Sequence, residues 1–330
     1  MIGQSELAGM SIVVISTGGT IASTPDEDAE GASPELTGDD LVAAVPEIGE
    51  VADIETYDFS NVPSAQFTIK QMGDLVEVVQ GYDDDPTVDG VVVTQGTDIL
   101  EESAYFVDLC YNGQTPVVFT GAMRNASLPS ADGPANLLAS IRTAAASETA
   151  AYGVLVAFND RIHAAREVTK MNSMNVDTFR SPEFGPLGVV DEGRVTYRRQ
   201  PTNPDSTFAP DSEQLTSDVH AVLVSADMPE AQIQAAAESS GLCLAATGAG
   251  HIPPRIIPDL EDLRAAGVPL VATTRCPEGR LARNTYSFRG SEMTLRELDA
   301  YFSDLNLQKT RIKTIVALAD GRLDEAFPQP

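Results

Sequence analysis

Two threonine hydroxyls and one lysine amine are the groups of this sequence whose positions favour nucleophilic chemistry. Thr20 and Thr97 each lie in a polar loop after a short apolar run, and Lys170 is one of only four lysines. A threonine hydroxyl is a weak nucleophile until a base takes its proton, and a lysine amine held neutral can be that base. The three residues therefore predict threonine attack assisted by lysine. The alternative for Lys170 is an ordinary solvated surface lysine.

The central part of the chain has the strongest local pattern. Residues 90–93 have the length and branching of a buried parallel strand, and a helical pattern of apolar residues begins at Leu100. Residues 94–98 form the turn between them, at the carboxyl end of the strand, where ligands bind in open α/β sheets. Asp98 also has a purely structural interpretation, because with Glu101 it resembles a helix N-cap in a capping box.

A second loop of this kind follows the apolar run 12–15 and reads Ser-Thr-Gly-Gly-Thr-Ile-Ala over residues 16–22. A glycine pair lets the backbone approach a ligand, and free N–H groups there can hold a carboxylate. The spacing matches neither the dinucleotide-binding fingerprint nor a P-loop. Ser60 and Asn61 belong to a third polar cluster at a strand end. The alternative is that the loop threonines only bond their own loop.

The order of elements predicts an α/β fold in two domains. Apolar runs of strand length alternate with helical patterns, which implies parallel sheets covered by helices on both faces. We expect a larger N-terminal domain over residues 1–197, a linker over 198–217 and a smaller C-terminal domain over 218–330. A polar, acidic flap is expected over residues 24–36, and a closing amphipathic helix over 295–305.

The charge balance is the most unusual bulk feature. The chain has 49 acidic and 21 basic residues and a formal net charge of −28. Such a charge repels nucleic acid and anionic membranes, so neither is expected as a partner. An acidic surface with few lysines suits a cytoplasm of high salt, where charges screen one another over a few ångströms. We therefore expect a halophilic source, a halophilic archaeon in particular.

Composition argues against metal, disulfide and membrane classes. The three cysteines are far apart, and no zinc-type spacing of Cys or His is present. No apolar run approaches the roughly 18 residues that cross a bilayer. The first ten residues contain no basic residue, unlike a secretory signal. We expect a cytoplasmic protein that needs no metal.

Four ordered blocks of the sequence resemble the bacterial-type L-asparaginase family. The blocks are residues 16–22, residues 94–106, residues 117–124 with 130–133, and residues 159–170. The likeness is dense from residue 11 to about 188 and thinner through the second half. It implies a larger flavodoxin-like N-terminal domain and a smaller C-terminal α/β domain.

The resemblance also implies an activity. Members of this family hydrolyse the side-chain amide of L-asparagine to aspartate and ammonia without a cofactor, and some also accept L-glutamine. They form homodimers or homotetramers whose active sites lie between two subunits. Carried over by position, Thr20 is the expected nucleophile. Thr97, Asp98 and Lys170 form a second, rigid triad in which the lysine is the base toward Thr97 or its water.

The substrate-binding residues follow from the same resemblance. Ser60, with Asn61 beside it, is expected to bind the α-carboxylate, and Asp98 the α-ammonium group. Gly19, Gly96 and Ala122 are also expected to bind the substrate, through their backbone. Of these, the region of Ala122 is expected to stabilise the oxyanion. The sequence departs from the family in having no tyrosine on the flap. Gln95 stands where the family commonly has histidine.

Two other functions fit part of this pattern. An asparaginase-like subunit of a tRNA-dependent amidotransferase has the same blocks, but the acidic surface disfavours tRNA. A non-catalytic amino-acid sensor would keep the fold and the pocket, yet binding alone needs no nucleophile and base. Amide hydrolysis is therefore the function that the sequence favours.

Overall fold

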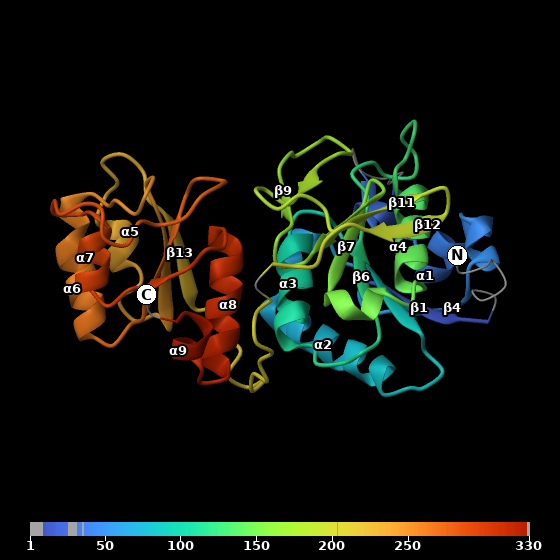
Figure 1. Ribbon diagram of the computed structural model, residues 1–330, viewed down its shortest axis with the longest axis horizontal. Helices are drawn as coiled ribbons and strands as arrows, with labels where there is room; N and C mark the ends of the chain where they lie inside the picture. The colour runs from blue at the N-terminus through green and yellow to red at the C-terminus, as the bar shows by residue number, and fades with distance from the viewer. Residues whose placement is uncertain (1–8, 26–31, 35, 203, 329–330) are drawn as a thin grey trace. The chain divides into compact units, whose positions relative to one another are not determined.

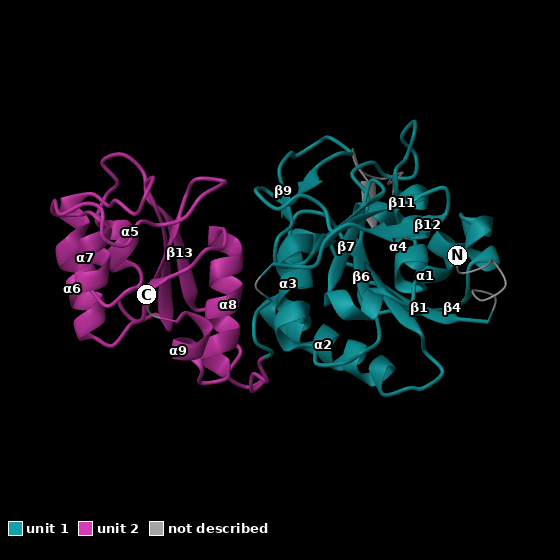
Figure 2. Ribbon diagram, viewed as in Figure 1, with its two compact units in different colours: residues 1–207 teal, residues 208–330 magenta. Residues whose placement is uncertain are grey.

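The computed structural model describes residues 9–25, 32–34, 36–202 and 204–328. The chain forms two compact units, residues 1–207 and residues 208–330 (Figure 2). The division falls within the stretch 198–217, where the sequence suggests a linker. Each unit has its own sheet and its own buried core, so each is described by itself.

The first unit is built on an eight-stranded sheet in the order β12-β11-β8-β7-β6-β5-β1-β4. Five neighbouring strands are parallel: β4 (Asp53–Asp58), β1 (Ser11–Ser16), β5 (Gly90–Thr94), β6 (Val117–Thr120) and β7 (Leu155–Phe158). The other three are antiparallel to their neighbours: β8 (Arg161–Ala164), β11 (Gly188–Asp191) and β12 (Arg194–Tyr197). The sheet is therefore mixed, with a parallel centre.

Helices cover both faces of this sheet, as Figure 1 shows. They are α1 (Gly38–Ala43), α2 (Ile69–Asp83), α3 (Leu100–Cys110) and α4 (Gly133–Ala144), with 3-10 turns η1 (Thr20–Ala22), η2 (Pro46–Glu50), η3 (Ser64–Gln66) and η4 (Thr149–Tyr152). Leu41 of α1 and Leu137 of α4 belong to one core with Val14, Val92 and Val118 of the strands. Successive strand residues alternate in direction, so the equally buried neighbours of these valines face α2 and α3.

Two small antiparallel sheets accompany the main one. β2 (Ser23–Pro25) pairs with β3 (Ala32–Pro34), and β9 (Thr169–Lys170) pairs with β10 (Phe179–Arg180). The flap expected over residues 24–36 includes residues 26–31 and 35, which lie outside the described residues.

The second unit contains a four-stranded sheet of parallel strands. Its order is β13 (Val219–Leu223), β14 (Gly241–Ala246), β15 (Leu270–Thr274) and β16 (Tyr301–Phe302). The helices are α5 (Ala231–Gln234), η5 (Pro254–Ile256), α6 (Ile257–Ala265), α7 (Glu292–Glu297), α8 (Leu307–Ala319) and α9 (Leu323–Ala326). The fold-class prediction is confirmed, with a larger N-terminal and a smaller C-terminal α/β unit.

Two details of the predicted elements are wrong. The closing helix over 295–305 does not exist, because α7 ends before Asp299, which has a φ of 52°, and the chain then enters β16. A positive φ at a non-glycine residue interrupts a helix. The other concerns the first sheet, which the alternation of elements predicted as parallel and which also contains the antiparallel strand β8. Asn159 and Asp160 both have positive φ and reverse the chain into β8, whose polar sequence did not suggest a strand.

Candidate active site

Three neighbouring strands end at one edge of the first sheet. β1 lies between β4 and β5, and its last residue, Ser16, pairs with the last residue of each neighbour. Because the three strands are parallel, the loops that follow them start side by side. The order of strands in the sheet thus brings together the loops that contain Thr20, Ser60 and Thr97.

The loops after β1 and β5 touch through two glycines. A Cβ added to Gly19 would lie 2.2 Å from the backbone nitrogen of Gly96, and Gly19 has a φ of 87°. Only a residue without a side chain fits this approach. Thr20 and Thr97 each follow one of the two glycines, and Thr20 begins η1. The two hydroxyl-bearing residues therefore lie on loops in direct backbone contact.

Thr17 and Ser60 connect the three loops. The backbone nitrogen and the Oγ1 of Thr17 both donate to the carbonyl of Thr94, each at 3.0 Å. The Ser60 hydroxyl donates to the carbonyl of Thr17, also at 3.0 Å. Asn61 is next to Ser60 in the loop after β4. Ser60 and Asn61 thus lie beside the loop that leads to Thr20.

Lys170 reaches the loop after β5 from the β9–β10 hairpin. Its Nζ donates to Oγ1 of Thr97 at 2.9 Å and to Oδ1 of Asp98 at 2.7 Å. The lysine side chain is 14% exposed and that of Asp98 is 67% exposed, while Thr97 is buried. The amine is therefore held inside the site, and the carboxylate keeps an open side.

Asp98 does not form the capping box that its spacing from Glu101 suggested. Helix α3 begins at Leu100 with Ile99 at the N-cap position, and no side chain caps it. The helix starts too late for Asp98 to be its N-cap, and the carboxylate instead contacts Lys170. The structural interpretation of Asp98 is wrong.

The loop after β6 lies against the same site. A Cβ added to Gly121 would lie 2.3 Å from the carbonyl oxygen of Gln95 and 3.4 Å from the Thr97 methyl group. The buried side chain of Asn136 donates from Nδ2 to the carbonyl of Gly121 at 2.9 Å. Ala122, which follows, is fully buried. This loop therefore has a fixed position next to Thr97.

These contacts bring together the predicted site residues from segments that are far apart in sequence. A hydroxyl and an amine at hydrogen-bonding distance, with a third group orienting the amine, are the usual arrangement of an activated nucleophile. Two sequence profiles then match the chain: Asparaginase, N-terminal, over residues 11–203, and Glutaminase/Asparaginase C-terminal domain over residues 218–328. The chain belongs to the asparaginase family.

Relatives from this family match nearly the whole chain. A glutaminase-asparaginase of Pseudomonas fluorescens biotype A is 31% identical over 93% of this chain and 86% of its own length. A probable L-asparaginase of Deinococcus radiodurans is 36% identical over 94% of this chain and 93% of its own. The crystal structure of a probable cytoplasmic L-asparaginase from Campylobacter jejuni is 32% identical, with a TM-score of 0.82 over 94% and 95% of the two chains.

Two residues outside the predicted site, Asn136 and Gln95, contact the loop after β6 that lies beside Thr97 in this asparaginase-family chain. Asn136 was not among the predicted site residues, because on a helix its sequence context shows only amphipathicity. In the sequence, Gln95 differs from the histidine that is common in the family at this position. Its side chain is buried, and among the described residues neither its Oε1 nor its Nε2 has a hydrogen-bond partner. A buried amide without partners costs free energy, so it fits a site that binds polar groups.

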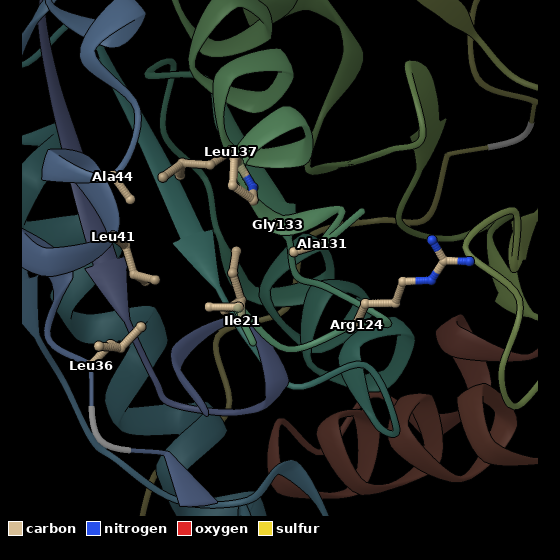
Figure 3. Close-up of a pocket in the computed structure, with 10 residues that line it drawn as sticks. Ile21, Leu36, Leu41, Ala44, Arg124, Ala131, Gly133 and Leu137 are labelled. Atoms are coloured by element: carbon tan, nitrogen blue, oxygen red, sulfur yellow. The ribbon is translucent and has the colours of Figure 1, made fainter. Parts of the chain in front are cut away.

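An apolar cavity of about 50 Å³ lies behind the turn that contains Thr20 (Figure 3). In the figure Ile21 of η1 faces Leu41 of α1 and Leu137 of α4 across it. Arg124, from the loop after β6, is also part of the lining. The turn with Thr20 thus rests on a side that is not fully packed.

The described part of this asparaginase-family chain contains neither a group of metal-ligating side chains nor a membrane-spanning helix. Within residues 9–25, 32–34, 36–202 and 204–328, no three His, Cys, Asp or Glu side chains are grouped so that they could hold a metal ion. In the same ranges no helix has both the length and the apolar character that spanning a membrane requires.

Proposed function

We propose that the protein is an L-asparagine amidohydrolase, which converts L-asparagine and water to L-aspartate and ammonia. The observation that carries the proposal is the contact of Lys170 with Thr97 and Asp98 beside the glycine contact that holds Thr20. The family and the names of the relatives support the same activity.

In the proposed reaction, the hydroxyl oxygen of Thr20 attacks the side-chain amide carbon of the substrate. The carbon–nitrogen bond breaks, and ammonia leaves with the hydroxyl proton. Thr20 then holds the aspartyl group as an ester. Lys170, through Thr97, removes a proton from water, which attacks this ester. The bond between the Thr20 oxygen and the carbonyl carbon then breaks, the proton passes back to the Thr20 oxygen, and aspartate is released. Backbone N–H groups of Thr97 and Ala122 stabilise the oxyanion in both steps, an effect worth several kcal/mol.

The substrate is held by its α-carboxylate and α-ammonium groups. Ser60 and Asn61 bind the α-carboxylate, and the backbones of Gly19 and Gly96, which contact each other, line the site next to this group. Asp98 binds the ammonium group, because Lys170 contacts only Oδ1 and most of the carboxylate is exposed. A substrate with both charges is bound more specifically than a simple amide.

Ammonia release from L-asparagine tests the proposal. We expect turnover in the intact chain and a loss of about a thousandfold or more in kcat/KM for Thr20→Ala, Thr97→Val and Lys170→Met. Lys70→Met, which changes an exposed lysine of α2, is the matched control and should leave kcat/KM unchanged. Full activity in the Thr20 and Lys170 variants would end the proposal. Tight binding of asparagine without turnover would instead point to a sensor.

L-Glutamine is the second candidate substrate, because a relative is named a glutaminase-asparaginase.

We further propose that the chain forms a homodimer or homotetramer in the cytoplasm of a halophilic archaeon, in keeping with its net charge of −28. Light scattering in molar salt should give two or four times the 35.0 kDa of one chain. A monomer with full activity would exclude shared active sites.

A further inference from the structure

The hairpin that contains Lys170 is internally fixed. Its connecting loop is closed by Asn172 and Thr178: the Asn172 nitrogen donates to Thr178 Oγ1 at 3.1 Å, and Thr178 Oγ1 donates to the Asn172 carbonyl. The Asn172 side chain accepts from the backbone nitrogens of Met174 and Asn175, both at 2.9 Å. Such a hairpin moves as one piece, so the place of Lys170 depends on where the hairpin is attached.

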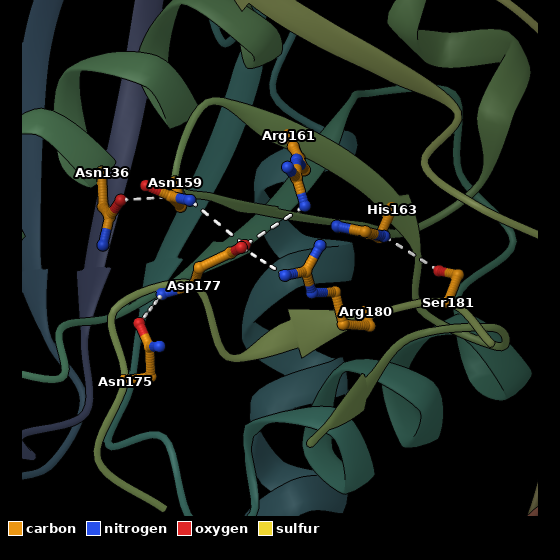
Figure 4. A network of polar contacts seen from close by, with 8 residues as sticks. All are labelled: Asn136, Asn159, Arg161, His163, Asn175, Asp177, Arg180 and Ser181. Atoms are coloured by element: carbon orange, nitrogen blue, oxygen red, sulfur yellow. Dashed lines mark hydrogen bonds and ion pairs between the residues drawn. The ribbon is translucent and has the colours of Figure 1, made fainter. Parts of the chain in front are cut away.

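Asp177 attaches this hairpin to the main sheet (Figure 4). Its Oδ1 accepts from Nδ2 of Asn159, in the β7–β8 turn, and from the guanidinium of Arg161 on β8, both at 3.2 Å. Its Oδ2 accepts from Arg180 of β10. One carboxylate thus joins the turn, the strand and the returning arm of the hairpin.

A second contact between the hairpin and β8 is made by His163, two residues after Arg161. Nδ1 of His163 is 2.9 Å from the hydroxyl of Ser181, which follows β10, and both side chains are buried. Arg161 and His163 are two positions apart on β8, so they face the same side of the sheet. The hairpin therefore lies along one face of β8 and is held by these two polar contacts, together with the packing of Phe179 of β10 on Phe158 of β7.

The polar chain continues from this attachment to the loop with Ala122. The backbone nitrogen of Asn159 donates to Oδ1 of the buried Asn136 at 2.9 Å. Nδ2 of Asn136 donates in turn to the carbonyl of Gly121. Asp177, Asn159 and Asn136 thus connect the segment that carries the amine to the segment beside the expected oxyanion position.

We propose that Asp177 is a positioning residue, which sets the place of Lys170 relative to Thr97 through the hairpin. The inference rests on the proposed amidohydrolase function. Asp177 itself is 30% exposed and Arg161 35%, so their ion pair adds little to stability. A displacement of a catalytic group by about 1 Å can nevertheless cost a hundredfold in rate. Loss of Asp177 should therefore lower the rate far more than the stability.

The first experiment compares Asp177→Ala with Asp177→Asn. The alanine variant should lower kcat for L-asparagine by about tenfold, with KM within about twofold and with unchanged affinity for L-aspartate in calorimetry. The asparagine variant keeps an oxygen that accepts from Asn159 and Arg161, and its kcat should stay within about threefold of the unsubstituted chain. A purely structural residue would move KM, aspartate affinity and melting temperature together with kcat.

The second experiment uses a matched pair in the β7–β8 turn. Asn159 and Asp160 have φ values of 49° and 57°, so glycine fits at either position without strain. Asn159→Gly removes the side chain that donates to Asp177, whereas the side chain of Asp160 is exposed. Asn159→Gly should lower kcat by about threefold or more, and Asp160→Gly should leave it unchanged.

The outcomes separate the two proposals. If the unsubstituted chain turns over asparagine and Lys170→Met does not, the amidohydrolase function stands. In that case, a kcat within twofold of the unsubstituted value in Asp177→Ala overturns the positioning role alone. Equal losses in Asn159→Gly and Asp160→Gly, or parallel losses of kcat, aspartate affinity and melting temperature, also overturn it. Equal turnover in the unsubstituted chain and in Lys170→Met would overturn the role of Lys170, and with it the positioning role of Asp177, whereas no turnover in the unsubstituted chain would overturn the amidohydrolase function.

Discussion

Gly19 lies where any side chain would collide with the neighbouring loop. A Cβ there would meet the backbone of Gly96 at 2.2 and 2.3 Å, and the φ of 87° is strained for other residues. We expect Gly19→Ala to lower the free energy of unfolding by about 2–4 kcal/mol and kcat/KM by about a hundredfold. Urea denaturation and ammonia release measure the two effects.

Gly49 provides the control for this substitution. No atom lies within 4 Å of a Cβ placed on it, and its φ is not positive. Gly49→Ala should change the free energy of unfolding by less than about 0.5 kcal/mol and leave activity intact. Equal effects at both glycines would refute the importance of the loop contact.

Asp83 is a residue whose charge contributes to stability. Burial alone would raise its pKa, but hydrogen bonds from Thr115, Tyr111 and Gln114 outweigh this and hold the pKa of the carboxyl below its usual range. A lowered folded-state pKa gives stability that is complete above the unfolded pKa of about 4 and is lost as the pH falls through the folded-state pKa. Asp83→Asn should cost about 1–2 kcal/mol at pH 7 and progressively less below about pH 4.

The neighbouring Asp84 is the control for Asp83. Its side chain is exposed at the end of α2. Asp84→Asn should have little effect on unfolding by urea at any pH between about 3 and 7. The same pH dependence of the stability loss in both variants would contradict the role given to the Asp83 hydrogen bonds.

The residue types of the candidate site could be selected from the sequence, whereas the contacts between them could not. Thr20, Thr97 and Lys170 stood out by residue type and by their loops. The 2.9 Å approach of Lys170 to Thr97 joins residues 73 positions apart, and no local pattern specifies it. The contact depends on Asn159 and Asp160, whose positive φ values turn the chain back into β8. The expectation that Lys170 acts together with Thr97 and Asp98 came from the resemblance to the asparaginase family and not from the spacing of residues.

Helix α2 allows a prediction at the level of an element. Gly81 lies inside this helix, is exposed, and has no atom within 4 Å of an added Cβ. Glycine in a helix interior costs about 0.5–1 kcal/mol relative to alanine, chiefly through the entropy of the unfolded chain. Gly81→Ala should therefore raise the free energy of unfolding by that amount in urea denaturation.

Gly267 shows whether open space at the Cβ or the backbone conformation decides the effect of a glycine-to-alanine substitution. It has equally open surroundings, but its φ is 89°. Alanine there should destabilise the protein by about 1 kcal/mol or more. If Gly81→Ala and Gly267→Ala both raise the free energy of unfolding, then the space around the added Cβ alone decides the effect, and this prediction is wrong.

Some elements have local sequence signals strong enough to specify them. Thr37 caps α1 with Asp40 in a reciprocal capping box, and an acid three residues after a threonine is typical of that motif. The hairpin of β11 and β12 turns at Glu192 and Gly193, both with positive φ. The wrong predictions lie where pairing with a distant strand decides the secondary structure. The chain after α7 pairs with β15 as strand β16, although its apolar spacing also fits a helix.

At the scale of the whole molecule, the sequence combines buried sheets in both units with a large excess of acidic residues. With a net charge of −28, repulsion within the folded chain falls as salt shortens the screening length from about 8 Å at 0.15 M to about 3 Å at 1 M. We expect the thermal midpoint to rise steadily between about 0.15 and 3 M KCl. Sucrose at equal osmolality, which does not screen charge, should give a smaller rise. A midpoint independent of KCl would contradict salt adaptation.

The two-unit organisation was readable because composition changes sharply along the chain. Residues 198–217 are rich in Pro, Ser, Asp and Thr, and the structure divides between Thr207 and Phe208. The order of strands within each sheet was not readable, because strand order depends on which crossovers pack, and many orders satisfy the same alternation. Sheet order decides which loops form the site, so its full geometry required the structure.

Each sheet draws its strands from one continuous segment, since β1 to β12 precede residue 208 and β13 to β16 follow it. On the ribosome, the first unit can therefore complete its hydrogen-bond ladders while the second is still being translated, a delay on the order of ten seconds. Once the first sheet is complete, none of its strands waits for a partner strand from the second unit. A slow codon stretch just after the boundary would lengthen this interval without leaving either sheet half built.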